Sequence, residues 1–419
     1  MQETNYIAGN YSKSKNRFFF LLMAFSAYSL MAYFLNALGV KAQFSIILLG
    51  EGLLAIPLLV YGYTHFSNRF NSSTRRWCLF VLLYMVFEFF NSFLFTPAHD
   101  TYIKEIVFWL FFLSIFLLSS SKVYWSYLLK WSVGIVVLAS VLSLYELLFN
   151  NYSYIRGEWD ENSFLYNIQI GFAPFLLVLC YSLLVKDKRN IIITIIVFVF
   201  YIGLQFYFQK RLPLARCLLS IVLLLYVLGT NLKMSKFLPS VVLLLTIIIG
   251  GLVFIVPKQY VDATIGRFTQ EGTVQQTTQD DIRYLILERA MDVTFSSPRT
   301  AIFGQGIGGV VLGDFYTKTV KDSNGNERPG LTQFEVGAAH ITFKYGLVFF
   351  FVMFGYMLRL LLRVRYYKKD PLAMSCWLYL TIFFVMCFVG ESFPNVFSVL
   401  TTVMTASSMG YLAYYGKGK

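Results

Sequence analysis

The stretch TFKYGLVFFFVMFGYMLRLLL, residues 342–362, decides the fold class. It is mostly apolar and has the length, about 20 residues, that a helix needs to cross a bilayer. The sequence RVRYYKKD follows directly at 363–370 and concentrates Lys and Arg. A long apolar run that ends in a basic cluster is typical of a transmembrane helix that ends on the cytoplasmic side. We therefore predict a membrane span here.

Similar apolar runs recur along the whole chain. Continuous runs of this length exclude the alternating strands of a membrane barrel, and the backbone in lipid otherwise requires helices. We predict an all-α polytopic membrane protein of about 12 transmembrane helices. The predicted spans lie near 18–38, 43–65, 77–96, 105–121, 127–149, 164–185, 191–208, 212–230, 237–256, 342–362, 372–390 and 395–415.

The composition agrees with lipid as the solvent. Of the 419 residues, 57% are hydrophobic and only 14% are charged, whereas a soluble domain carries roughly 25% charged residues. The net charge of +13 would point to nucleic acid in a soluble protein. Here most cations sit in short clusters between apolar runs, which indicates membrane topology and no nucleic-acid partner.

The basic clusters orient the predicted helices. With both termini in the cytoplasm, every second loop is cytoplasmic, and these loops hold most of the cations. The first run, 18–38, is too long for a signal peptide and lacks a clear cleavage site, so we expect it to be retained. The cytoplasmic cations are Arg69, Arg75, Arg76, Lys122, Lys186, Lys188, Arg189, Lys233, Lys236, Arg363, Arg365, Lys368, Lys369, Lys417 and Lys419.

Cysteine and histidine give no sign of a metal site. The five cysteines lie in or beside apolar runs without a CxxC pair, and the three histidines are far apart. We predict neither a disulfide nor a metal or other cofactor.

One predicted external loop is long and divides the chain. Residues 1–256 hold helices one to nine, 257–341 form the loop, and 342–419 hold helices ten to twelve. The loop contains the helical pattern IRYLILERAMDVTF at 282–295, followed by Pro298. Its apolar content predicts a small helical subdomain resting on the membrane rather than a tether.

Some cations lie on the predicted outer side, against the rule that Lys and Arg concentrate in cytoplasmic loops. Lys210, Arg211 and Arg216 lie between the seventh and eighth predicted helices, and Arg216 sits about one turn inside the eighth. Charge at membrane depth is usually functional or paired, although snorkelling to the interface is the alternative. Arginine suits phosphate binding because its planar group donates two parallel hydrogen bonds.

The loop adds two further candidate features. Its arginines, among them Arg267 and Arg283, can bind phosphate or pair with neighbouring acids. The glycine run at 303–309, FGQGIGG, can cradle a phosphate or form a tight turn with close backbone packing.

Carboxylates also occur within or near the predicted spans. Glu51 and Glu88 lie deep, and Glu146 lies near an outer helix end. They are either proton or ion sites, as in a transporter, or partners in interhelical hydrogen bonds. A separate external acidic loop at 158–161 offers a general base or a solvated surface.

The order of these features resembles the bacterial O-antigen polymerase and ligase superfamily. The family motif R…A…P…FGxG matches Arg283, Ala290, Pro298 and Phe303–Gly306, and the basic loop with Lys210 sits where the family has another essential arginine. The segment from Gln333 to Gly346 then resembles the family's closing segment.

The resemblance implies a C-type glycosyltransferase fold in the bacterial inner membrane. Such enzymes act on undecaprenyl-diphosphate-linked oligosaccharides at the periplasmic side and are thought to need no metal. Family ligases carry a His about eleven residues before the glycine that corresponds to Gly346, and this chain has Glu335 there. The departure favours a polymerase over a ligase. A chain-length regulator protein is a further candidate partner.

The resemblance also assigns roles to residues. Arg211, Arg216 and Arg283 bind the donor diphosphate, and Lys210 and Arg267 support them. Fixed arginines stabilise the charge that builds on the leaving diphosphate.

The acceptor hydroxyl needs a residue that orients or deprotonates it, and Glu335 and His340 are the candidates. The catalytic set is therefore Arg211, Arg283, Glu335 and His340. The alternatives are a ligase, a transporter or flippase of lipid-linked sugars, and a scaffold protein. The long external loop favours the enzyme over a transporter.

Overall fold

The computed structural model describes all of the predicted helices except the first and the ninth. The described residues are 44–95, 99–149, 169–207, 211–231, 287–312, 319–321, 327–331, 336–389, 393 and 399–416. The predicted spans at 18–38 and 237–256 lie outside these ranges. Within them the chain is mostly helical.

Every predicted span that falls in the described ranges is a helix. The helices are α2 (Phe44–Phe66), α3 (Ser72–Phe95), α4 (His99–Leu118), α5 (Lys122–Phe149), α7 (Gln169–Val185), α8 (Lys188–Tyr207), α9 (Arg211–Asn231), α13 (Pro298–Phe303), α14 (Gly337–Leu361), α15 (Val364–Tyr367), α16 (Pro371–Cys387) and α17 (Val399–Tyr415), with a 3₁₀ turn η1 at Ser67–Arg69. Residues 287–295 are also helical. Helix α14 begins at Gly337, five residues before the approximate start predicted for the tenth span.

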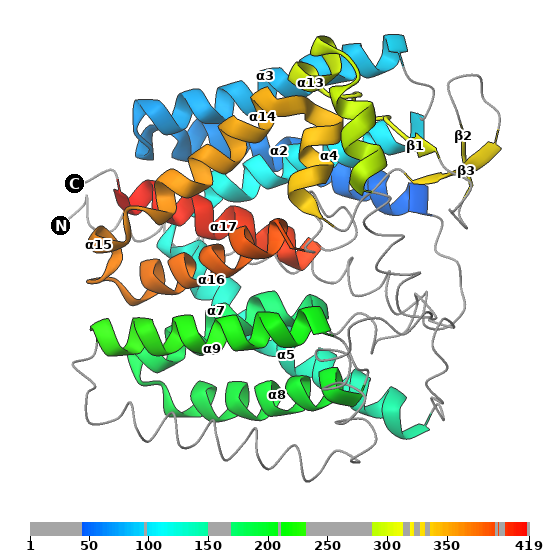
Figure 1. Ribbon diagram of the computed structural model, residues 1–419. Coiled ribbons are helices and arrows are strands. Elements are labelled where there is room, and N and C mark those ends of the chain that lie inside the picture. Colours follow the sequence, from blue (N-terminus) through cyan, green and yellow to red (C-terminus); the bar gives the residue numbers. More distant parts are fainter. Residues whose placement is uncertain are drawn as a thin grey trace.

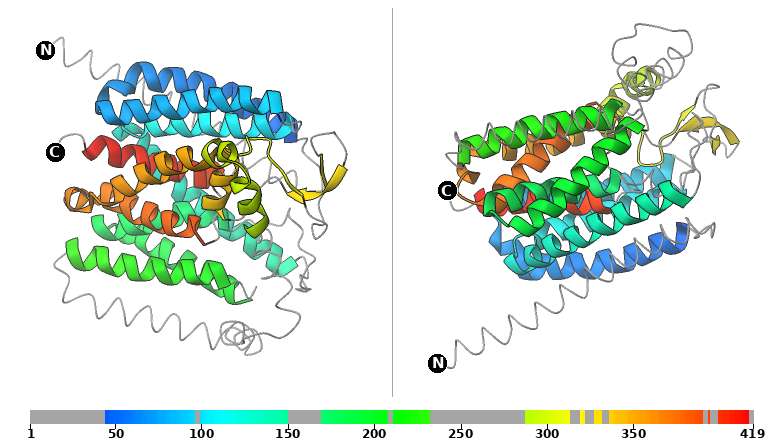
Figure 2. Two further views of the ribbon diagram at one scale, coloured as in Figure 1. Left: turned by 45° about the horizontal axis from the view of Figure 1, so that its top comes forward. Right: turned by 90° about the horizontal axis from the view of Figure 1, so that it is seen from below.

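The long helices lie side by side as a bundle (Figure 1). Helix α4 packs against α2 and α17, α16 packs against α17 and α7, and α7 packs against α5 and α8. Two further views show the same arrangement, with the strands and α13 at one end of the bundle (Figure 2).

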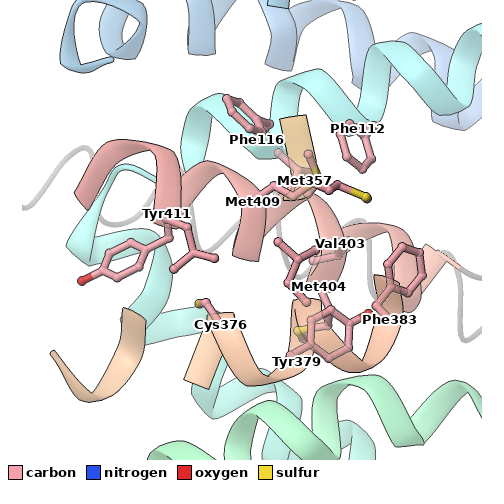
Figure 3. Close-up of a cluster of buried hydrophobic side chains, with 14 of the residues drawn as sticks. Phe112, Phe116, Met357, Cys376, Tyr379, Phe383, Val403, Met404, Met409 and Tyr411 are labelled. Atoms are coloured by element: carbon pink, nitrogen blue, oxygen red, sulfur yellow. The ribbon is translucent and has the colours of Figure 1, made fainter. Parts of the chain in front are cut away.

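The core lies between α4, α14, α16 and α17, where large apolar side chains interdigitate (Figure 3). Phe112 and Phe116 of α4 face Met357 of α14 and Met409 of α17 there. Helix α17 approaches α4 closely, because a Cβ on Gly410 would overlap the carbonyl of Phe116. Small residues at such a crossing let two helix backbones come near each other.

The basic turns gather at one end of the bundle, which we name the cationic end. There Arg359 donates to Ser73 Oγ at 2.7 Å, and Arg69 donates to the Ser120 carbonyl at 3.3 Å. The turns α2–α3, α4–α5, α7–α8 and α14–α16 all lie at this end, and the strands lie at the other (Figures 1 and 2). The exposed cations of the cationic end include Arg75, Arg76, Lys122, Lys186, Lys188, Arg189, Arg365, Lys368 and Lys369.

Among the described residues, α14 alone is long and apolar enough by itself to cross a bilayer. The segments Glu105–Leu118 and Lys122–Leu138 meet the same criterion together but are bent by 116° at their junction. A buried core helix of a soluble protein can meet this criterion too. Large apolar side chains are exposed along several helices, at Val60, Tyr63, Leu83, Phe90, Ile192, Ile196, Leu218, Val222, Phe351 and Leu358.

The loop before α14 was predicted to form a small helical subdomain, and its described residues contain three short strands as well as helix. Strands β1 (Val311–Leu312), β2 (Thr319–Lys321) and β3 (Glu327–Leu331) form an antiparallel sheet in the order β1-β3-β2. Strand β1 pairs with the end of β3 and β2 with its beginning, so among the described strands Pro329 has a partner on one side only. A proline, which lacks an N–H, is tolerated at such an edge.

Candidate functional site

Helix α14 is broken at Gly346, which has φ 73° and ψ 177°. The carbonyl groups just before a break lose the N–H groups that would bond to them in a continuous helix. These carbonyls therefore need other hydrogen-bond donors. Gln305 N donates to the Phe343 carbonyl at 2.8 Å, and Gly306 N donates to the Lys344 carbonyl at 3.0 Å. The Tyr84 hydroxyl of α3 donates to the Tyr345 carbonyl at 2.5 Å. Groups outside α14 therefore satisfy these three carbonyls at the break.

The glycine run packs directly on this break. Gly304 has φ 78°, and a Cβ there would overlap the Lys344 carbonyl. The amides of Gly304, Gln305, Gly306 and Gly309 all donate to backbone carbonyls. Of the two predicted roles, close backbone packing is therefore correct, and these four amides do not cradle a phosphate in this structure.

The other motif residues hold the glycine run against α14. Ser297 caps α13 by accepting from Thr300 N at 3.2 Å, and Pro298 is the first residue of that helix. Gln305 Nε2 donates to the Val293 carbonyl at 3.0 Å. Ala290 is buried against Val311 and Phe343. The described residues of the motif thus converge on the first half of α14.

A buried carboxylate faces that half-helix from α4. Glu105 accepts hydrogen bonds from Lys344 Nζ on one oxygen and from the Tyr345 hydroxyl on the other. His340 Nε2 lies 3.7 Å from Glu105 Oε1. The relative exposure is 3% for Glu105, 1% for His340 and 0% for Lys344. We name Glu105, His340, Lys344 and Tyr345 the Glu105 cluster.

Aromatic side chains wall the Glu105 cluster. Trp109, one turn after Glu105 on α4, donates its Nε1 hydrogen to Tyr345 Oη at 3.0 Å. Its ring meets the Tyr345 ring edge-to-face, at 6.0 Å and 89°. Phe349 and Phe393 also contact Trp109. Such walls keep water away, which strengthens the electrostatic interactions inside.

A chain of hydrogen bonds leads from the surface to another buried carboxylate. Exposed Arg299 of α13 donates to Asn91 Oδ1 at 3.0 Å, and Asn91 Nδ2 donates to Glu88 Oε2 at 3.5 Å. Glu88 is fully buried, and its Oε1 has no hydrogen-bond partner among the described residues. A buried carboxylate in this state is expensive as an anion.

The site thus combines two buried carboxylates, a lysine and a histidine. The attraction between Glu105 and Lys344 offsets the cost of their desolvation. The imidazole of His340 is a side chain that can accept and release a proton. In the described part of the chain, no group of three His, Cys, Asp or Glu is placed to hold a metal ion.

The predicted site residues divide into three groups. Arg216 is buried at 8% exposure near Tyr379 and Cys387 of α16, and His340 belongs to the Glu105 cluster. Arg211 is the first residue of α9, and its side chain is not among those described. The remaining predicted site residues, Lys210, Arg267, Arg283 and Glu335, lie outside the described ranges.

Arg216 and the Glu105 cluster lie toward the same end of the bundle. Tyr226, in the later part of α9, has its ring 6.2 Å from that of Trp377, near the start of α16 at the cationic end. Helix α9 therefore begins at the opposite end, with Arg211, where α13 and the strands also lie (Figure 1).

The sequence prediction missed Glu105 and Lys344. A signal was present, because Lys344 is a cation inside the predicted span 342–362 and Glu105 opens the predicted span 105–121. Charged residues at such positions commonly pair with one another.

No family model matches this chain, and no curated protein sequence matches it. Its function is therefore inferred from the residues and their geometry.

Proposed function

We propose that this chain is an inner-membrane glycosyltransferase that polymerises a surface polysaccharide such as O-antigen. It transfers a growing glycan from undecaprenyl diphosphate to a sugar hydroxyl of another lipid-linked repeat unit. One observation carries the proposal. The described residues of the motif converge with His340 at the end of the bundle where α9 begins with Arg211.

The distribution of charge and apolar surface supports a membrane location. Exposed apolar residues recur one turn apart, as at Ile192 and Ile196 of α8 and at Leu218 and Val222 of α9. Contiguous apolar surface of this kind is rare on soluble monomers. The cationic end matches the concentration of Lys and Arg on the cytoplasmic side of membrane proteins.

The chemistry requires stabilisation of the leaving diphosphate. As the sugar–phosphate bond breaks, negative charge grows on the phosphate oxygens, and fixed guanidinium groups stabilise it most when they are shielded from water. Arg216 is buried beside aromatic residues and so meets that condition. Arg211 is the first residue of the same helix, and we propose that it has the same role.

Transport of lipid-linked sugars is the second candidate function. Buried Glu88 and the buried Glu105–Lys344 pair favour it, because ionisable groups inside a membrane bundle often mark proton or ion routes. The β-containing segment before α14 favours the enzyme, since a transport path needs no such segment.

A reconstitution experiment separates these functions. Purified protein in vesicles receives the lipid-diphosphate repeat unit, and the chain length of the lipid-linked products is measured. The polymerase predicts a ladder of longer chains. Transfer only to a lipid A core acceptor would indicate a ligase, and movement of unchanged substrate across the vesicle membrane would indicate a transporter.

A further inference from the structure

Glu105 contacts three groups of α14, and only one of them, His340, has a role in the proposed reaction. We propose that Glu105 is the positioning residue of His340 and that Lys344 opposes the electrostatic effect of Glu105 on the ring. Glu105 and Lys344 together then set the charge carried by the imidazole. The catalytic part of this inference rests on the proposed function. The electrostatic part can be measured without it.

The geometry makes Glu105 the shared partner. His340 and Lys344 are one turn apart on α14, so both project from the same face of the helix. Glu105 Oε1 lies 3.7 Å from His340 Nε2 and also accepts from Lys344 Nζ. Glu105 Oε2 accepts from the Tyr345 hydroxyl, so both carboxylate oxygens are engaged. The carboxylate is therefore fixed relative to the ring.

Stability alone is a poor reason for such a cluster. Apolar side chains of similar volume commonly stabilise an interior as well as a buried ion pair does. The pair has a specific electrostatic effect on His340, because Glu105 attracts a proton to the ring and Lys344 repels it. The other titratable groups near the cluster are Tyr84 and Glu88 of α3 and, beyond Asn91, Arg299 of α13.

In the proposed reaction, the acceptor hydroxyl oxygen bonds to the anomeric carbon of the donor sugar. The bond from that carbon to the diphosphate oxygen breaks, and its electron pair leaves with the diphosphate. The hydroxyl proton goes to His340, either directly or by way of water. Glu105 then stabilises the imidazolium that forms.

The test is a titration of His340 by NMR with isotope-labelled histidine in the full-length, detergent-solubilised protein. The chain has three histidines, and the signal lost in His340→Gln identifies the residue. Lys344→Met removes the repelling charge and is expected to raise the titration midpoint of His340 by on the order of one pH unit. Adding Glu105→Gln to Lys344→Met removes the attracting charge and is expected to lower the midpoint again by a similar amount.

The double variant contains no unpaired buried charge, so it keeps the experiment informative if a single variant fails to fold. Lys122→Met, an exposed change at the cationic end, is the matched control and leaves the midpoint unchanged. Equal midpoints in Lys344→Met and in the double variant would overturn the inference.

The rate of polymerisation provides the second readout. The acid limb of the pH–rate profile is expected to move to higher pH in Lys344→Met and to lower pH, relative to that variant, in the double variant. If the wild type does not polymerise but the titration midpoint of His340 is higher in Lys344→Met than in the double variant, the proposed function fails and the electrostatic link stands. If the wild type polymerises and the limb does not move, the positioning role is wrong.

Discussion

The backbones of Gly304 and Gly346 are in contact, and both residues have positive φ. Gly304 ends α13, and Gly346 breaks α14, so this contact joins the glycine run to the half-helix that carries His340. A Cβ on either residue would overlap backbone atoms of the other segment. The position of the motif relative to the Glu105 cluster depends on this contact.

Substitution at this contact is expected to be costly. Gly346→Ala combines a strained positive φ with a steric overlap and is expected to destabilise the protein by about 2–4 kcal/mol. Gly355→Ala is the control in the same helix, because nothing lies within 4 Å of its added Cβ, and a helical Gly→Ala change is neutral or stabilising. Thermal unfolding in detergent measures both. Equal unfolding temperatures for the two variants would contradict this role of Gly346.

The Glu105–Lys344 pair predicts a pattern of non-additive stability. Glu105→Gln leaves Lys344 buried without its counter-charge and is expected to cost about 3–5 kcal/mol. Lys344→Met is expected to cost less, because His340 can supply the positive charge beside Glu105. The double variant Glu105→Gln/Lys344→Met is expected to be near the wild type. A double-mutant cycle of unfolding free energies checks this, and strictly additive losses would refute the coupling.

Arg216 is expected to be needed for activity more than for folding. Arg216→Ala removes the proposed donor to the diphosphate and is expected to lower the rate of chain elongation about 10²–10³-fold. Arg216→Lys keeps the charge but loses the bidentate geometry, and an intermediate loss is expected. Arg75→Ala, exposed at the cationic end, is the matched control. Full activity in a folded Arg216→Ala protein would exclude Arg216 from the site.

The two ends of the bundle are expected to face opposite sides of the membrane. All five cysteines are buried, so new cysteines can be labelled in the native background with an impermeant maleimide. Lys188→Cys and Lys368→Cys, at the cationic end, are expected to react only in permeabilised spheroplasts. Ser296→Cys, at the opposite end, is expected to react in intact ones. Labelling of all three positions in intact spheroplasts would contradict the proposed topology.

The sequence was sufficient to predict the helices but not the contacts between them. Apolar runs of this length have few alternatives, so each predicted span in the described ranges is helical. Boundaries were less certain, as the start of α14 at Gly337 shows, because polar residues extend a helix beyond its apolar run. The strands β1 to β3 are too short to give an alternating pattern.

The candidate site was predicted only in part. His340 was identified, but its partner Glu105 lies in an earlier helix, and a single sequence contains no information on which charged residues meet across a bundle. The glycine run allowed two roles until the amides of Gln305 and Gly306 were located on the carbonyls of α14. Backbone partners of this kind follow from the break at Gly346, which the sequence alone does not reveal.

Chain elongation by the purified protein tests the central claim most directly. Wild-type protein and Arg216→Ala, both in vesicles, receive the same undecaprenyl-diphosphate-linked repeat unit, and product length is read on a gel. The proposed polymerase predicts a ladder of lipid-linked chains with the wild type and little or none with the variant. A folded wild type that leaves every repeat unit at its original length would contradict it.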